Sequence, residues 1–336
     1  MINNRISKYS SNIDFVILWV DPSDNKWQKQ REKYDLLSGD KRKNRFRDFE
    51  NLQYLFRGIE KYAPWVNKIF FITWGHVPSW LNTENEKIRV VRHDEFIPKK
   101  YLPTFNSNVI EMNLHNIQEL SEKFVLLNDD IFILRKLNKK DFFHDDLPND
   151  MYIEYIKENP SFRHNIMKKN YLQIINKYYD KKDFIKKYKK KIYSIKYGVK
   201  GIICNYKNQR KEEFQDFYTD HLSRSFLKST FSEVWEKENK ILDIACFNRF
   251  RADNDIGQTL CRYFQLLSGN FYPSKSLGKY FEIQNDTSKI EQVIKSRKYK
   301  MICINDVKEE IDFENIKKNI NSAFYKIFDE KSKFER

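Results

Sequence analysis

Short, continuous apolar runs alternate with longer amphipathic segments along the chain. Residues 13–20, 68–73 and 124–127 are apolar runs rich in β-branched and aromatic residues, the pattern of strands buried on both faces of a sheet. Between the first two runs, residues 45–62 carry apolar side chains at helical spacing, with Asp48 expected as the N-cap or as a first-turn acid. This strand–helix–strand order predicts an α/β fold with a mostly parallel central sheet flanked by helices.

The same periodicities predict the elements of the remaining chain. Helical spacing over residues 109–120 places Glu111 and His115, four residues apart, on one face of a helix. The other expected elements are strands at 88–91 and 300–306, helical structure within 240–285 including a helix at 256–267, and a final helix at 312–328.

One long segment differs in composition from its surroundings. Residues 150–235 are rich in Lys and Tyr, show helical spacing and contain no clear strand pattern. We therefore divide the chain into an N-terminal part of an α/β catalytic core at 1–149, a mostly helical Lys-rich insertion at 150–235, and a C-terminal part that completes the core at 236–336.

Composition excludes several classes of protein. Only 8 Gly and 8 Pro exclude collagen-like and low-complexity chains, and 27 Phe, 20 Tyr and 6 Trp argue against general disorder. Lys and Arg number 62 against 47 Asp and Glu, a net charge of +15. This surplus attracts nucleic acid, acidic lipid and anionic glycans alike, which is one interpretation of the charge. The alternative interpretation is that the lysines only form a solvated helix surface.

The apolar runs are too short for a transmembrane protein. None approaches the ~20 residues that a membrane-spanning helix needs, and residues 1–12 lack the apolar core of a signal peptide. We therefore expect a cytoplasmic protein, either free or peripheral on the inner face of the cell membrane. The cysteines are widely spaced without a metal-ligand pattern, so we expect reduced, packed thiols at Cys204, Cys246, Cys261 and Cys303.

Carboxylates follow three of the predicted strands. Asp21 comes after the first strand, Asp129 and Asp130 follow the strand at 124–127, and Asp306 ends the last one. Carboxylates at one sheet edge suit Mg²⁺ or Mn²⁺ with a bound diphosphate, while a structural or capping role is the alternative. The phosphate-binding P-loop and dinucleotide fingerprints are absent from the sequence.

Two further segments carry residues suited to phosphate chemistry. His221 suits proton abstraction from a hydroxyl, because a neutral imidazole is available near neutral pH. Arg249 and Arg251 suit phosphate oxygens through the forked geometry of the guanidinium. By spacing alone each remains ambiguous, since a lone His is commonly structural and a surface Arg is commonly just solvated.

Taken together, these motifs resemble the Stealth family. The sequence IDFVILWVDPSD at 13–24 resembles the first signature region of that family. The further matching segments, in order, are 45–65, 69–81 and 102–130 for the second region, 221–269 for the third and 301–306 for the fourth. The resemblance covers most of the chain, apart from the helical stretch near 150–215 and the two tails.

The resemblance implies a fold, an activity and its substrates. Stealth proteins are hexose-1-phosphate transferases, and they include bacterial capsular and exopolysaccharide phosphotransferases and the catalytic core of N-acetylglucosamine-1-phosphotransferase. The implied fold is Rossmann-like, of the nucleotide-sugar transferase type. The implied donor is a UDP-hexose or UDP-N-acetylhexosamine, used with Mg²⁺ or Mn²⁺. The acceptor is a glycan or lipid-linked oligosaccharide, the product a phosphodiester, and UMP is released. No nucleic-acid partner is implied.

The resemblance also implies roles for individual residues. Position by position, it makes His221 the base, with His115 as the second candidate. It makes Glu111 and Asp130 catalytic carboxylates and Arg251 a phosphate-contacting residue. Nucleotide- or phosphate-side residues are Asp21, Arg57 (which is otherwise structural), Arg249 and Asn305, and the metal ligands are Asp129, Asp130 and Asp306.

The sequence departs from the family pattern at three places. Pro22 replaces the usual Gly after the first Asp, and Glu50-Asn51 replaces an acidic pair. The sequence after His221 is also atypical, which is why His115 is retained as a candidate base.

Three other functions remain open from sequence. They are a metal-dependent glycosyltransferase that releases UDP, a non-enzymatic polyanion-binding protein, and an inactive family member that acts as a scaffold. The Lys surplus of the insertion is expected to hold the protein near anionic lipid or near a phosphate-bearing glycan acceptor.

Overall fold

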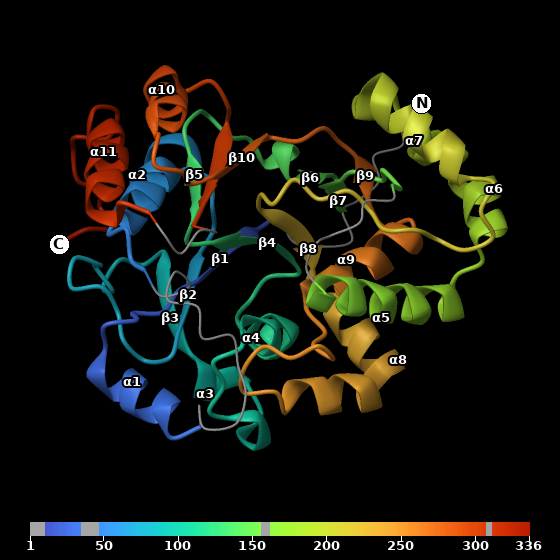
Figure 1. Ribbon diagram of the computed structural model, residues 1–336, viewed down its shortest axis with the longest axis horizontal. Helices are drawn as coiled ribbons and strands as arrows, with labels where there is room; N and C mark the ends of the chain where they lie inside the picture. The colour runs from blue at the N-terminus through green and yellow to red at the C-terminus, as the bar shows by residue number, and fades with distance from the viewer. Residues whose placement is uncertain (1–10, 35–46, 156–161, 307–310) are drawn as a thin grey trace.

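A five-stranded sheet forms the centre of the molecule, in the order β3-β2-β1-β4-β8 (Figure 1). The computed structural model describes residues 11–34, 47–155, 162–306 and 311–336. Four strands are parallel, and β8 runs antiparallel to β4 at one edge. The strands are β1 (Ile13–Leu18), β2 (Ile69–Thr73), β3 (Ile88–Arg92), β4 (Lys123–Asn128) and β8 (Arg224–Leu227). The predicted mostly parallel α/β fold is confirmed.

Successive residues of the central strands supply two separate cores. Phe15 and Ile17 of β1 pack into the core on one face of the sheet, while Val16 packs into the core on the other face. Because neighbouring side chains of a strand point to opposite faces, a continuous apolar run is what a sheet covered on both sides requires.

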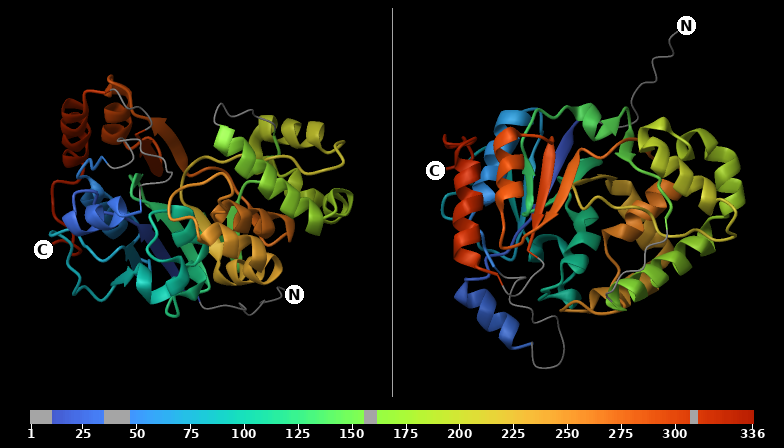
Figure 2. Two further views of the ribbon diagram at one scale, coloured as in Figure 1. Left: turned by 60° about the horizontal axis from the view of Figure 1, so that its bottom comes forward. Right: turned by 45° about the horizontal axis from the view of Figure 1, so that its top comes forward.

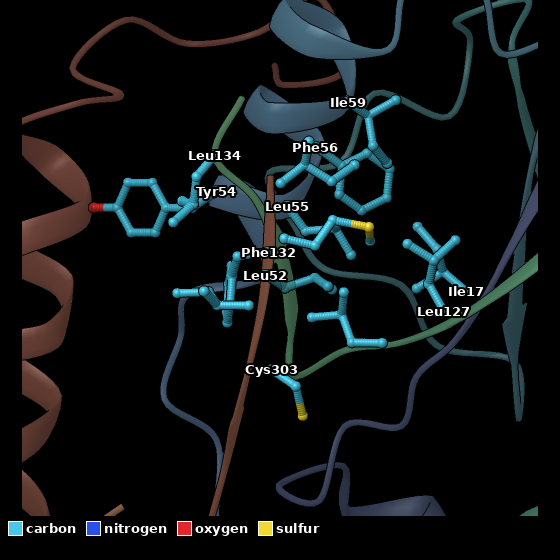
Figure 3. Packing of buried hydrophobic residues seen from close by; sticks show 14 of the residues in the cluster. Ile17, Leu52, Tyr54, Leu55, Phe56, Ile59, Leu127, Phe132, Leu134 and Cys303 are labelled. Carbon is cyan, nitrogen blue, oxygen red and sulfur yellow. The ribbon is translucent and has the colours of Figure 1, made fainter. Parts of the chain in front are cut away.

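Helices cover both faces of this sheet. One face carries α2 (Leu52–Tyr62), α10 (Ser288–Ser296) and α11 (Phe313–Tyr325). The other face carries α4 (Ser107–Met112), α8 (Lys228–Cys246) and α9 (Gln258–Leu267). The shorter helices α1 (Asn25–Glu32) and α3 (His93–Phe96) follow β1 and β3. Figure 3 shows the first core, in which Leu52, Leu55, Phe56 and Ile59 of α2 lie near Ile17, Leu127, Phe132 and Leu134.

Two small sheets flank the central one. The first has the order β10-β11-β5, with β10 (Gly278–Glu282) parallel to β11 (Met301–Asn305) and β11 antiparallel to β5 (Ile131–Ile133). The second joins β6 (Phe143–His144), β7 (Leu147–Asp150) and β9 (Tyr272–Pro273). The first small sheet matters for the site, because it brings the end of β11 to the turn between β4 and β5.

Three helices stand together on the side of the molecule away from α11 and the C-terminus (Figures 1 and 2). They are α5 (Phe162–Tyr178), α6 (Lys181–Ile192) and α7 (Gly198–Asn208), with the 3₁₀ turn η5 (Ile195–Tyr197) between the last two. A buried ion pair between Lys181 Nζ and Glu154 Oε1, 2.7 Å apart, anchors α6 to the preceding chain.

Several predicted elements differ from the structure. Residues 224–227 form β8 inside the range predicted as helical, and β9 and β10 form strands within 240–285. Their apolar positions are few, and their strand character comes from pairing with distant segments, which local periodicity does not encode. The boundary at 235 between the insertion and the C-terminal part of the core therefore stays a prediction. Strand β8 of the central sheet already lies before this boundary.

The predicted helix at 109–120 is also wrong beyond Met112. Helix α4 ends there, and only a 3₁₀ turn, η3 (Leu114–Asn116), follows. The Asn113 side chain donates a hydrogen bond to the Val109 carbonyl, 2.8 Å away, and so competes with continuation of the helix. Glu111 and His115 consequently do not share a helix face.

The start of α2 lies later than expected. Its N-cap is Asn51, whereas Asp48 lies outside the helix and accepts a hydrogen bond from the Glu50 backbone N–H at 2.7 Å. Residues 45 and 46 of the predicted helix, like 1–10 and 156–161, lie outside the described residues. All four cysteines are free thiols, as predicted. Each helix in the described part of the chain is too short or too polar to cross a membrane.

Candidate active site

Acidic residues gather where the parallel strands β1 and β4 end. Leu18 pairs with Asn128 in the register of these two strands, so the segments that follow them leave the sheet at the same edge. Asp21 lies in the first segment and Asp129 and Asp130 form the tight turn into β5. The predicted juxtaposition of these acids follows directly from the parallel pairing.

Asp130 is held by the neighbouring strand β11. Its carbonyl accepts a hydrogen bond from the Ile304 N–H at 2.9 Å, and its Oδ2 accepts one from the Cys303 thiol at 3.3 Å. Its other oxygen, Oδ1, is buried and accepts no hydrogen bond from the described residues. Burial raises the pKa of Asp130 to about 6, although the hydrogen bond from Cys303 opposes the shift.

Asp129 belongs to a group of like charges. Its side chain is exposed, yet the surrounding protein removes enough water to raise its pKa, and repulsion from Asp130 and Asp48 adds to the shift. Burial also raises the pKa of Asp48, although the hydrogen bond from the Glu50 backbone N–H opposes the shift, and the charges of Glu50 and Asp21 add to it. We call Asp21, Asp48, Asp129 and Asp130 the acidic cluster. Carboxylates that repel one another in this way are stabilised by a bound cation.

Asp306 lies next to this cluster but has a cationic neighbour. Extending the antiparallel register of β5 and β11, in which Cys303 pairs with Ile131, places Ile304 and Asn305 opposite Asp130 and Asp129, and Asp306 follows directly. The Asp306 carboxylate accepts a hydrogen bond from Arg47, whose Nη1 lies 3.2 Å from Oδ2. Strand β11 belongs to the small sheet, so the expectation that the three acid-bearing strands end at one edge of a single sheet is wrong for Asp306.

The donor set fits a metal shared with a diphosphate better than one held by protein alone. The described residues contain no group of three or more His, Cys, Asp or Glu side chains that could hold a metal ion. Mg²⁺ in nucleotide sites typically takes one or two carboxylates, with phosphate oxygens and water completing six ligands. The buried Oδ1 of Asp130 and the exposed carboxylate of Asp129 would supply those two donors. The metal set Asp129, Asp130 and Asp306 stays a prediction.

His221 lies within reach of the same region. It is exposed, and its ring contacts that of Tyr280, with the centroids 4.9 Å apart. Tyr280 in turn lies close to Asp130. The Asp130 carboxylate contributes to the raised pKa of the Tyr280 phenol, although burial and the charge of Glu282 have larger effects. His221 has a φ of 54°, a left-handed conformation that is uncommon for residues other than Gly, although His adopts it more often than most side chains. Strain of this kind is concentrated at functional sites.

His115 lies elsewhere. Its ring packs against Trp235, with centroids 6.0 Å apart, and burial lowers its pKa to about 4. The positive charge of Lys228 lowers this pKa further. Lys228 lies at the amino end of β4, because its backbone N–H donates a hydrogen bond to the Glu122 carbonyl. The acidic cluster lies at the carboxyl end of β4. The structure therefore separates His115 from the cluster that His221 approaches.

Glu111 and Arg251 form a second polar group. Glu111 is buried, and its Oε2 accepts a hydrogen bond at 3.4 Å from the N–H of Gln258, the first residue of α9. Burial raises the pKa of Glu111 to about 7, although Arg251 and this N–H oppose the shift. Arg251 donates from Nη2 to the Ser107 hydroxyl at 2.7 Å.

An amide network that the sequence analysis missed supports this group. The Asp255 carboxylate accepts hydrogen bonds from the side-chain amides of Asn106, Asn108 and Asn248, at 2.9, 3.1 and 2.9 Å. Arg249 lies in the same loop, with its guanidinium 4.7 Å from the centre of the Tyr34 ring. The network fixes the loop that carries both arginines against the start of α4.

Arg57 has a structural position. Its Nε and Nη2 donate to the two carboxylate oxygens of Glu335 at 2.8 and 2.7 Å, and its Nη1 donates to the Phe328 carbonyl at 2.6 Å. All three guanidinium nitrogens are thus engaged in tying α2 to the C-terminal segment. Of the two roles predicted for Arg57, the structural one agrees with this geometry.

Three site neighbours were not singled out from sequence. His76 accepts a hydrogen bond from the Asp21 N–H at 2.7 Å, and burial lowers the pKa of its imidazole, so it is a neutral acceptor. Arg47 and Tyr280 contact Asp306 and His221 as described above. Arg47 and His76 stand in the segments resembling the second Stealth region, whereas Tyr280 lies outside the matched segments.

Comparisons with known proteins agree with the resemblance found in the sequence. Residues 11–39 match the model of Stealth protein CR1, conserved region 1, and residues 45–150 match that of Stealth protein CR2, conserved region 2. A capsular polysaccharide phosphotransferase, WcwK of Streptococcus pneumoniae, is 42% identical over 98% of this chain and 99% of the relative.

Two further relatives are similar over nearly their whole length. The exopolysaccharide phosphotransferase cps2G of Lactiplantibacillus plantarum is 37% identical over 96% of both chains. The receptor polysaccharide phosphotransferase WefC of Streptococcus gordonii is 34% identical over 96% of this chain and 98% of the relative. Among solved structures, the galactosyltransferase LgtC aligns over 92% of this chain and 95% of its own, with a TM-score of 0.40 and 10% identity, which is too distant to support a conclusion.

Proposed function

Because this chain belongs to the Stealth family, we propose that it is a phosphotransferase of capsular or exopolysaccharide biosynthesis. The observation that carries the proposal is the similarity to phosphotransferases over nearly the full length of both chains. The convergence of the acidic cluster and His221 at the carboxyl edge of the sheet supports it, because that edge is where open α/β sheets bind ligands.

The finer proposal concerns the bonds that change. A hydroxyl of the acceptor glycan attacks the phosphorus atom attached to the sugar of a UDP-sugar. The bond between this phosphorus and the bridging oxygen breaks, and the oxygen leaves with UMP. The anomeric C–O bond stays intact, so the sugar keeps its configuration. Such a reaction depends chiefly on positioning and charge stabilisation.

The residues of the site divide this work. Asp130 and Asp129 would hold the divalent cation, whose contribution is to neutralise the diphosphate and stabilise the leaving UMP. His221 accepts the proton of the attacking hydroxyl at its ring nitrogen. Arg251 contacts the transferred phosphoryl oxygens. Burial raises the pKa of Glu111 to about 7, so this carboxyl compensates the charge of Arg251 less than an ordinary carboxylate would.

The identity of the released nucleotide tests this proposal. The protein is incubated with a panel of UDP-sugars, Mg²⁺ and candidate oligosaccharide acceptors, and the nucleotide and ³¹P signals are measured. UMP together with a phosphodiester resonance is the expected result. UDP would instead identify a glycosyltransferase and overturn the finer proposal.

A matched pair of variants then tests the acidic cluster. Asp130→Asn should lose turnover, whereas Asp145→Asn, at an exposed turn position with φ of 56° that Asn tolerates, should retain it. Equal turnover in both variants would exclude a role for Asp130.

A further inference from the structure

The segment from η5 through α7 exposes an unusual number of apolar side chains. Ile195, Val199, Ile203 and Tyr206 are 88%, 74%, 46% and 56% exposed. Three of them, at 199, 203 and 206, are spaced four and three residues apart and therefore form one stripe along α7. We call these four residues the apolar stripe.

The opposite face of α7 is firmly attached to the protein. Asn205 is buried and donates from its side-chain amide to the carbonyls of Tyr152 and Ile192, both at 2.7 Å. Gly201 is buried as well, and a Cβ there would lie 2.8 Å from the Cβ of Tyr197. Because this inner face is fixed, the apolar stripe has to point outward.

Positive charge surrounds the apolar stripe. Residues 182–211 contain eleven Lys and Arg and one Asp, a net charge of +10 against +15 for the whole chain. Lys200 and Lys207 follow stripe residues directly on α7 and are exposed. On α6, Lys186, Lys187 and Lys190 are exposed as well. The end of α6 is tied to α7 by the hydrogen bond from Tyr193 to Gln209, 2.6 Å long.

A second exposed apolar patch lacks this charge pattern. Ile241, Ile244 and Phe247 near the end of α8 are 40%, 62% and 47% exposed. The neighbouring Asp243 forms an ion pair with Lys100, so charges of both signs meet there. Several exposed apolar side chains thus lie close together in sequence in both α7 and α8, but those of α7 lie within a strongly basic segment.

We propose that the apolar stripe and the surrounding lysines form a surface that docks on an anionic membrane. Helix α7 would lie in the interface, with the stripe among the acyl chains near the headgroups and the lysines at anionic headgroups. A nucleic acid or soluble polyanion would use the charge but leave the stripe exposed to water. Figures 1 and 2 show α6 and α7 on the outside of the molecule, where a flat surface can reach them.

Sedimentation with vesicles tests this docking surface without any substrate, so its outcome is independent of the proposed function. The full chain is mixed with vesicles of phosphatidylcholine alone or with phosphatidylglycerol, at low and high salt. We expect binding to the anionic vesicles at low salt and release at high salt. Equal binding to neutral vesicles, or binding only to a soluble anionic polymer, would overturn the proposal.

Variants separate the apolar and charged contributions. Combining Ile195→Ser, Val199→Ser and Ile203→Ser should weaken binding to anionic vesicles roughly tenfold or more, because three inserted side chains are lost. Ile244→Ser, which removes an equally exposed side chain from the α8 patch, should leave binding unchanged. Combining Lys186→Gln, Lys187→Gln and Lys190→Gln should also weaken binding roughly tenfold or more. Circular dichroism verifies that each variant is folded. Full binding to anionic vesicles by the folded triple Ser variant would refute the proposed docking surface.

Discussion

At the scale of single residues, the two candidate bases have different environments. His221 is exposed, strained and next to Tyr280, whereas His115 is half-buried against Trp235 with a pKa lowered to about 4. A base with so low a pKa holds a proton poorly in the transition state near pH 7. The structure therefore favours His221, which the family pattern also indicated.

Substituting each histidine tests this assignment. His221→Asn keeps a residue that tolerates positive φ, so the backbone is preserved while the base is removed. Turnover should fall by ~10²- to 10⁴-fold with folding intact. His115→Ala should instead lower thermal stability and leave most turnover. Steady-state kinetics and thermal unfolding distinguish the two, and loss of turnover in the His115 variant alone would reverse the assignment.

Glu111 predicts a pH dependence of stability. Burial raises its pKa from 4.5 to about 7, so the folded protein keeps a proton that the unfolded chain loses between these values. The stabilising contribution of this group is complete below pH 4.5 and declines as the pH rises toward 7. Glu111→Gln removes this titration. The free energy of unfolding of the wild type should fall relative to that of the variant across this range, by at most about 3 kcal/mol.

Urea unfolding of both proteins at several pH values measures the difference. A difference between the two that stays constant from pH 4.5 to 8 would show that the Glu111 carboxyl titrates normally.

At the scale of elements, α2 packs directly onto β5, the strand that follows the Asp129–Asp130 turn. A Cβ at Gly58 of α2 would lie 2.6 Å from the Ile133 carbonyl oxygen. Backbone atoms cannot move aside as a flexible side chain can. Gly58 therefore sets the spacing between α2 and β5. This packing also holds the Asp129–Asp130 turn in place, because β5 follows that turn directly.

Gly58→Ala should consequently destabilise the protein, although Ala is the better helix former. Helix propensity alone would stabilise the variant by ~1 kcal/mol. Overpacking against a backbone oxygen should outweigh this, giving a net loss of about 1–3 kcal/mol. Chemical denaturation measures the sign, with Lys61→Ala at an exposed position of the same helix as control. A stabilised Gly58 variant would contradict the close packing.

At the scale of the whole molecule, a buried ion pair attaches the helices α6 and α7 to the rest of the protein. The side chains of Lys181 and Glu154 are 1% and 2% exposed. Lys181 also donates to the carbonyls of Asn208 and Glu213, at 2.8 and 2.9 Å, so one ammonium joins α6 to the end of α7 and to the following loop. Its charge is fully used within the fold and does not contribute to the basic surface.

Removing this ammonium should therefore be severe. Lys181→Met leaves Glu154 buried without its counterion, and the free energy of unfolding should fall by ~3–5 kcal/mol. Adding Glu154→Gln should recover part of the loss, because it removes the uncompensated charge. Thermal and denaturant unfolding measure both effects, and a mild effect of Lys181→Met would show that Glu154 is not buried in solution. Lys182→Met, at an exposed neighbouring position, is the control.

Local patterns determined much of this protein. The apolar runs of β1, β2 and β4 have the composition of strands covered on both faces, and the stripes of α2, α9 and α11 have helical periodicity. Parallel order then places the acids after β1 and β4 at one edge. Periodicity and strand order are properties of neighbouring residues, so the sequence by itself predicts them.

Only the tertiary structure decided which distant groups meet. Pairing of β5 with β11 brings Cys303 to Asp130, and the turn before β8 brings His221 to Tyr280. The same packing carries His115 to the other end of β4 and engages Arg57 with Glu335. Proximity and burial also set the pKa values of Asp130 and Glu111. These depend on long-range strand pairing and on exclusion of water by segments far away in the chain, which no local pattern encodes.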